Sequence, residues 1–286
     1  MSCTDGDKAM VPDADFLTEN EAAELRWAYA RLEHPSFAAR LSSVIGVPIE
    51  RTLKLLPQSW YRAIENGAEA SIARAAHVAV SSLGKDHARW AGDGRHRALA
   101  ALAGAAGGFA GPLGLLGELP VMTLLMLRSI AAIAHRHGED LDDDGTRLAC
   151  VEVFGLGARS REDDGAETGY YGIRGTLAFH FGGTLSHHAT PKSLPAGVDF
   201  IRGVASRFGV AVSDATAARI VPVVGAVSGA ALNVIFMQHF QDVAKGHFIV
   251  RRLERKYGVQ AIRLAYDRTA QLADQAAREF SPLEGW

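Results

Sequence analysis

The chain has 286 residues, and its 32 acidic and 30 basic side chains give a formal net charge of −2. This length supports a buried core, and the near-neutral charge excludes the basic balance that is typical of nucleic-acid-binding proteins. The 48 alanines favour helices, because alanine has the highest helix propensity. Two cysteines, Cys3 and Cys150, are too few for a disulfide framework. The composition predicts an all-α protein in a reducing compartment.

Residues 1–15 are polar and acidic, and they lack the apolar run of a secretory signal. Ser2 stands where N-myristoylation needs a glycine. We therefore predict a flexible N-terminal segment at 1–15, a single all-α domain at 16–286 and a cytoplasmic location. A membrane-peripheral location is the alternative.

The helices expected along the chain begin with a capping box at Thr18 and Glu21, which predicts a helix ending near Glu33. A loop is expected at 159–169, and the glycine- and aromatic-rich stretch 170–197 gives the least readable pattern, from which we assign no element. Further helices are expected over 36–46, 59–83, 98–108, Pro120 to Gly138, 144–156, 198–208 (stopped by Gly209), 213–220 (capped by Ser213), 222–257 and the C-terminal stretch that follows.

Two uncharged runs, 98–117 and 220–241, are long enough to span a membrane. The first carries six glycines and Pro112 among few strongly apolar side chains, which weakens insertion into a bilayer. We predict a buried helix pair in a soluble core. Contact with lipid at the protein surface is the alternative.

Glycines recur at four-residue spacing in both runs, at Gly104 and Gly108 and again at Gly225 and Gly229. This spacing lets a second helix backbone approach closely. It is also compatible with a smooth groove wall for a long apolar ligand, in which Phe109 of the first run would take part. Both interpretations stay open.

Four polar side chains stand in apolar helical runs where burial is expected: Glu118, Arg128, Glu152 and Asn233. A buried charge needs a partner or a wet cavity. The residues therefore indicate a structural ion-pair network or a polar anchor at one end of an apolar cavity. In the second case Arg128 would bind a carboxylate or phosphate. Catalytic use of the carboxylates is a third interpretation.

Signatures of cofactor and metal sites are missing from the sequence. The histidine pairs 135/137 and 187/188 do not have the spacing of metal ligands on one helix face, and no nucleophile elbow or phosphate-binding loop occurs. We predict no cofactor, no metal and no catalytic residue.

Two long blocks resemble the signature regions of the EcsC protein family, which is named for a protein encoded beside the Ecs ABC transporter. They read GAAGGFAGPLGLLGELPVMTLLMLRSIAAIAHRHG at 104–138 and PVVGAVSGAALNVIFMQHFQDVAKGHFIVRRLERKY at 222–257. The resemblance covers roughly residues 50–260. Glu118 departs from the family pattern, where aspartate is expected. The matching positions are Gly107, Pro112, Glu118, Pro120 and Arg128 in the first block, and Pro222, Gly225, Ala226, Gly229, Ala230 and Asn233 in the second.

The resemblance implies an all-α bacterial protein, intracellular or membrane-peripheral, with no established reaction and with a link to lipid or fatty-acyl cargo. Together with the uncharged glycine-rich runs, it leads us to expect a non-catalytic binder of a fatty acid or lipid. The alternatives are a membrane-peripheral or ABC-transporter-associated accessory protein, and a lipid-directed hydrolase that uses Glu118 and Glu152.

Overall fold

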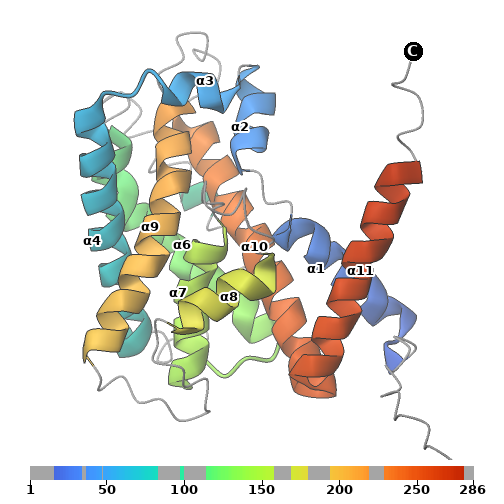
Figure 1. Ribbon diagram of the computed structural model, residues 1–286. Helices are drawn as coiled ribbons and strands as arrows, with labels where there is room; N and C mark the ends of the chain where they lie inside the picture. Colours follow the sequence, from blue (N-terminus) through green and yellow to red (C-terminus); the bar gives the residue numbers. More distant parts are fainter. Residues whose placement is uncertain are drawn as a thin grey trace, which may run out of the picture.

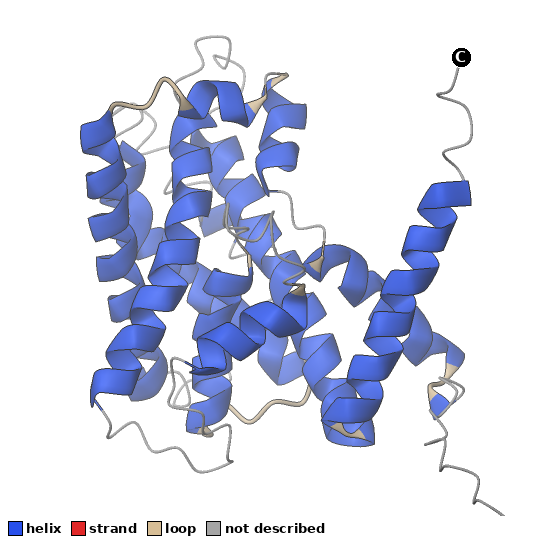
Figure 2. Ribbon diagram, viewed as in Figure 1, coloured by secondary structure: helices blue, strands red, loops and turns tan. Residues whose placement is uncertain are grey.

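A computed structural model describes residues 16–33, 37–46, 48–82, 97–99, 114–157, 169–179, 194–218 and 229–279. Within these ranges the chain forms helices and no strand, which confirms the predicted all-α fold (Figure 2). The predicted flexible segment 1–15 lies outside the described residues. In chain order the helices are α1 Glu19–Leu32, α2 Phe37–Ile45, α3 Ile49–Leu53, α4 Gln58–Ser82, α6 Gly114–Arg136, α7 Asp144–Leu156, α8 Tyr170–Phe179, α9 Leu194–Ala218, α10 Gly229–Tyr257 and α11 Val259–Glu279.

Two helices begin at the side-chain caps that the sequence indicates. Thr18 Oγ1 accepts from the Glu21 amide at 3.3 Å, and the Glu21 carboxylate accepts from the Thr18 amide at 3.1 Å. The predicted capping box is therefore confirmed at the start of α1. Asp143 caps α7 by accepting from the Thr146 amide at 2.8 Å.

The helices form a bundle in which α4 packs against α6, α7 and α9. Helix α10 contacts α6 and α7 and continues past them to α1 and α11, which stand to one side (Figure 1). Helices α4, α6 and α10 begin at the end of the bundle where α9 finishes and where α2 and α3 lie, at the top of Figure 1. We call this the upper end.

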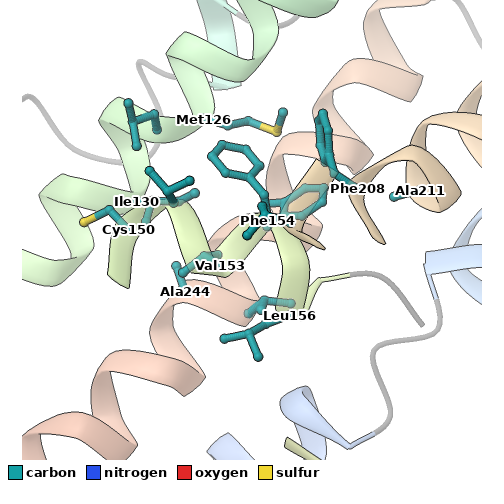
Figure 3. Packing of buried hydrophobic residues seen from close by; sticks show 14 of the residues in the cluster. Met126, Ile130, Cys150, Val153, Phe154, Leu156, Phe208, Ala211 and Ala244 are labelled. Carbon is teal, nitrogen blue, oxygen red and sulfur yellow. The ribbon is translucent and has the colours of Figure 1, made fainter. Parts of the chain in front are cut away.

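Aromatic rings from α7, α9 and α10 meet in the core. The Phe154 ring lies 5.2 Å from the Phe208 ring, edge to face, and 5.6 Å from the Phe240 ring. Figure 3 shows Met126 and Ile130 of α6 on the same cluster. All five side chains are fully buried, so side chains of four helices fill this part of the core.

Helix α6 begins earlier than the sequence predicts. Pro120 is expected at the first turn, but α6 starts at Gly114 and Pro120 stands inside the helix. A proline in the second turn removes the hydrogen bond to the carbonyl of Leu116, and the helix nevertheless continues through it. The predicted end near Gly138 agrees with the structure, because α6 ends at Arg136 and Gly138 has a φ of +78°.

The predicted break at Gly209 is wrong, because α9 runs continuously from Leu194 to Ala218. Gly209 is buried in the helix, and a Cβ there would lie 3.8 Å from that of Ala68 on α4. Ser213 does not cap a new helix, since its hydroxyl donates to the Gly209 carbonyl one turn back at 2.9 Å. Close packing of α4 on α9 overrides the low helix propensity of glycine.

Part of the stretch 170–197, to which the sequence pattern assigns no element, is helical. Tyr170–Phe179 forms α8, and α9 already begins at Leu194. Helix α8 packs on α7 and α9. Its first turn is attached to α1, because the Tyr170 amide donates to the Glu33 carboxylate at 2.9 Å.

Candidate functional site

A hydrogen bond between Glu118 and Asn233 joins the two signature blocks. Asn233 Nδ2 donates to Glu118 Oε2 at 3.0 Å, and the Asn233 side chain is buried. Glu118 belongs to the second turn of α6, and Asn233 to the second turn of α10. The bond therefore brings together two of the predicted site residues at the upper end of the bundle.

Helices α6 and α10 run parallel from this bond onward. Gln241 Nε2 donates to Ser129 Oγ at 2.7 Å in the middle, and Arg251 Nε donates to Glu139 Oε1 at 2.8 Å beyond the end of α6. Arg97 reaches the same row, since its Nε donates to Gln241 Oε1 at 2.9 Å. Polar contacts thus fix the register of the two helices along their whole length.

The glycine residues predicted to line a groove lie mostly outside the described residues. This holds for Gly104, Gly108, Phe109 and Gly225. Gly229 is described, and it is the first residue of α10, one turn ahead of Asn233. Helix α6 begins at Gly114, one turn ahead of Glu118. The first residues of α6 and α10, which belong to the two uncharged runs, therefore lie about one helical turn, or roughly 6 Å, from the Glu118–Asn233 bond.

Arg128 is expected to be buried, but its side chain is exposed. It lies on the outward face of α6, two turns after Val121, which is 55% exposed. The buried face of this helix carries Met126, Leu127 and Ile130 instead. Both faces of α6 carry apolar residues. The sequence around Arg128 therefore resembles a buried run although this arginine faces outward.

Glu152 belongs to a different part of the molecule. Burial raises the pKa of its carboxyl, against the lowering effect of the nearby Arg174 and Arg251. Arg251 and Asn233 lie about 27 Å apart along α10, at a rise of about 1.5 Å per residue. Glu118 and Glu152 therefore do not share one site.

A buried polar cluster surrounds Arg174 of α8 and Glu254 of α10. Arg174 Nη1 donates to the two carboxylate oxygens at 2.8 and 3.1 Å, and the Tyr171 hydroxyl donates to Glu254 Oε1 at 3.0 Å. Burial is the largest cause that raises the pKa values of Tyr170 and Tyr171. The cluster attaches α8 to α10 through a charge pair that is largely shielded from water.

The same cluster includes His247, whose side chain is fully buried. The Tyr170 hydroxyl accepts from Arg174 Nη1 at 3.2 Å and lies 2.9 Å from His247 Nδ1. The Tyr170 hydroxyl and His247 Nδ1 share one hydrogen bond, and the tautomer of the imidazole sets which of the two donates. Among the described residues Nε2 has no hydrogen-bond partner. Burial lowers the pKa of His247 well below its usual value, so the ring is neutral.

Sequence reasoning did not identify this cluster. Tyr170 and Arg174 stand one helical turn apart, which is a usable local signal. Their partners His247 and Glu254 follow about 80 positions later. A single sequence does not indicate which distant helix meets α8.

One described helix, Gly117–Arg136, is long and apolar enough to cross a membrane by length and composition, and most of it is buried inside the protein. In the described part of the chain, no group of three or more His, Cys, Asp or Glu residues could hold a metal ion. Cys150 is buried, and burial raises the pKa of its thiol.

The model of the EcsC protein family matches residues 35–253. The described residues form an all-α fold, in which the described parts of the two signature blocks contain the paired helices α6 and α10. The chain belongs to the EcsC protein family. No curated protein and no solved structure matches it.

Proposed function

We propose that the chain binds a long apolar ligand, a lipid or other fatty-acyl compound, at the upper end of the bundle and without catalysis. The observation that carries the proposal is the hydrogen bond between Glu118 and Asn233. It joins α6 and α10 within about one turn of the points where the two uncharged runs enter these helices. Sites for such ligands are mostly apolar, with few polar groups that orient the ligand.

An exposed apolar side chain of α6 at the same end supports the proposal. Val121, in the second turn of this helix, is 55% exposed. The runs 98–117 and 220–241, in which the first residues of α6 and α10 lie, contain no Asp, Glu, Lys or Arg. An acyl chain that lies here gains about 0.8 kcal/mol for each CH₂ group it removes from water.

The charge of Glu118 points to the polar group of the ligand. A free fatty acid would bring its own carboxylate near that of Glu118, and the exposed Arg128 lies about 15 Å further along α6. Like charges repel, whereas a hydroxyl or amine donates to a carboxylate. The ligand is therefore an acyl lipid with a hydrogen-bond donor in its polar group rather than a free fatty acid.

A displacement assay tests this proposal with a fluorescent acyl probe. Mono-oleoylglycerol should displace the probe at a lower concentration than oleic acid does. Glu118→Gln keeps an acceptor for Asn233 but removes the charge, and it should weaken mono-oleoylglycerol binding by about tenfold. Glu152→Gln, on α7 near Arg251, is the matched control and should bind as the wild type does.

Three results would count against the proposal. The first is that no acyl compound displaces the probe. The second is that oleic acid binds more tightly than mono-oleoylglycerol, and the third is that the two glutamine variants weaken binding equally. Association with a membrane transporter stays a prediction from the family resemblance, and none of these results depends on it.

A further inference from the structure

The turn between α3 and α4 carries a surface that the proposed function does not use. We call residues 49–62 the α3–α4 corner. Ile49, Thr52 and Leu56 are buried and hold it to the bundle, while Leu55 is 66% exposed. Among the large apolar side chains in the described ranges, this is the highest exposed fraction.

Hydrogen bonds hold the corner in a defined shape. The Leu55 amide donates to the Thr52 carbonyl at 3.0 Å, and the Leu56 amide donates to that of Leu53 at 3.1 Å. The Tyr61 hydroxyl crosses the turn to the same Leu53 carbonyl at 2.9 Å. Leu55 is therefore held outward by the backbone of the turn, beside Tyr61, which is 36% exposed.

Three bases stand within seven positions of this leucine in the sequence. Arg51, Lys54 and Arg62 are exposed, and none of them forms an ion pair or a side-chain hydrogen bond with any residue that the structure describes. The stretch from Pro48 to Ile64 contains one acid, Glu50, although the whole chain has a net charge of −2. The corner is therefore a local positive patch on a slightly acidic protein.

The corner also lies at the upper end, where α3 contacts α9 and α4 begins (Figure 1). An exposed leucine, interfacial aromatics (Trp60 and Tyr61) and unpaired bases together match the chemistry of a bilayer surface with anionic lipids. A nucleic acid would attract the bases but would leave Leu55 in water. An acidic protein is an outcome that the experiment below distinguishes.

We propose that the α3–α4 corner docks the protein onto the surface of an anionic lipid bilayer. Leu55 enters the boundary of the acyl chains, the aromatic rings lie among the headgroups, and Arg51, Lys54 and Arg62 face the anionic lipids. This docking goes beyond the proposed function, because it requires no bound lipid.

Co-sedimentation of the full chain with vesicles tests the docking. The protein should bind vesicles of phosphatidylcholine with 30% phosphatidylserine, and it should bind much less to phosphatidylcholine alone or at 0.5 M salt. Arg51→Gln/Lys54→Gln should weaken binding by about 25-fold, at about fivefold per base. Arg26→Gln/Arg74→Gln removes the same charge from exposed positions elsewhere and should have little effect.

Leu55→Ser isolates the apolar contribution, with Leu272→Ser as the control because Leu272 is 57% exposed on α11. Leu55→Ser should weaken binding to the vesicles with phosphatidylserine by about tenfold, and Leu272→Ser should not. Circular dichroism and melting checks that all four variants fold as the wild type does.

The docking proposal is overturned if the wild type stays in the supernatant with anionic vesicles, or if the control variants lose as much binding as the corner variants. It is also overturned if Leu55→Ser has no effect, because the bases would then form a general polyanion site such as one for an acidic protein. Mono-oleoylglycerol should still displace the acyl probe from the corner variants. Failure of the displacement assay therefore speaks against the proposed function alone.

Discussion

At the scale of single residues, polar side chains inside this bundle are held by partners from distant parts of the sequence. Glu118 and Asn233 are 115 positions apart, and Arg174 and Glu254 are 80 positions apart. The geometry of each pair fixes which atom donates and which accepts. A substitution that keeps the hydrogen-bond acceptor is therefore expected to cost less stability than one that removes it.

Glu118→Leu should lower the free energy of unfolding by about 1–3 kcal/mol, because the buried Asn233 amide loses its hydrogen bond to the carboxylate. Glu118→Gln keeps an acceptor at the same position and should cost less than about 1 kcal/mol. Urea denaturation of the two variants measures the difference. Equal losses would show that the bond does not contribute to stability.

His247 makes stability depend on pH. Its pKa is lowered in the folded protein, so below the ordinary value of about 6.5 the unfolded chain binds a proton that the folded chain does not. Stability is therefore full above this pH and falls as the pH falls. His239 acts in the same direction, since burial lowers its pKa to about 4.

Between pH 7 and pH 5, His247 alone should account for a loss of about 2 kcal/mol in the free energy of unfolding. Urea titrations of the wild type and of His247→Gln at both pH values measure this share. The variant should lose about 2 kcal/mol less than the wild type over the interval. An identical loss in both proteins would mean that the folded state protonates His247 normally.

At the scale of helices, the sequence predicts where most of them lie but not where some of them begin or break. The capping box at Thr18 and the acidic start of α7 are local signals, and the structure confirms both. Gly209 and Pro120 are local signals as well, yet α9 and α6 continue through them. Contacts with other helices decide these two positions, and a single sequence does not contain them.

The residues of the candidate site are likewise only partly predictable from the sequence. Glu118 and Asn233 were predicted because each is a polar residue in an apolar run, and the structure joins them. Arg128 gave the same signal but faces outward, because α6 is apolar on its outer face too. The Tyr170–His247 contact was missed because it depends on how α8 docks on α10.

A pair of glycines tests the importance of close helix packing. A Cβ at Gly157 would lie 2.4 Å from the Phe240 ring in the core, whereas a Cβ at Gly175 in α8 has nothing within 4 Å. Gly157→Ala should destabilise the protein by about 1–3 kcal/mol. Gly175→Ala should stabilise it by about 0.5–1 kcal/mol, since alanine favours a helix interior.

Chemical denaturation of the two glycine variants gives the sign of each change. A neutral result for Gly157→Ala would mean that Phe240 moves aside without cost and that the α7–α10 contact is loosely packed.

At the scale of the whole molecule, the two ends of the bundle differ in chemistry. The lower end is rich in ion pairs, among them Arg251 with Glu139 at 2.8 Å and Lys256 with Glu21 at 2.7 Å. The pKa of Glu139 is lowered, because Arg251 and Arg255 outweigh the raising effect of burial. The upper end instead has exposed Leu55 and Val121 and the entries of the two uncharged runs into α6 and α10. This asymmetry supports both proposals, each of which assigns the apolar chemistry to the upper end.

The most direct measurement is mass spectrometry of an organic extract from natively purified protein. The account predicts an acyl lipid with a hydroxyl or amine in its polar group, at a level close to one molecule per chain and reduced in Glu118→Gln but not in Glu152→Gln. An extract without lipid, from a protein that also fails to bind mono-oleoylglycerol in solution, would contradict the account.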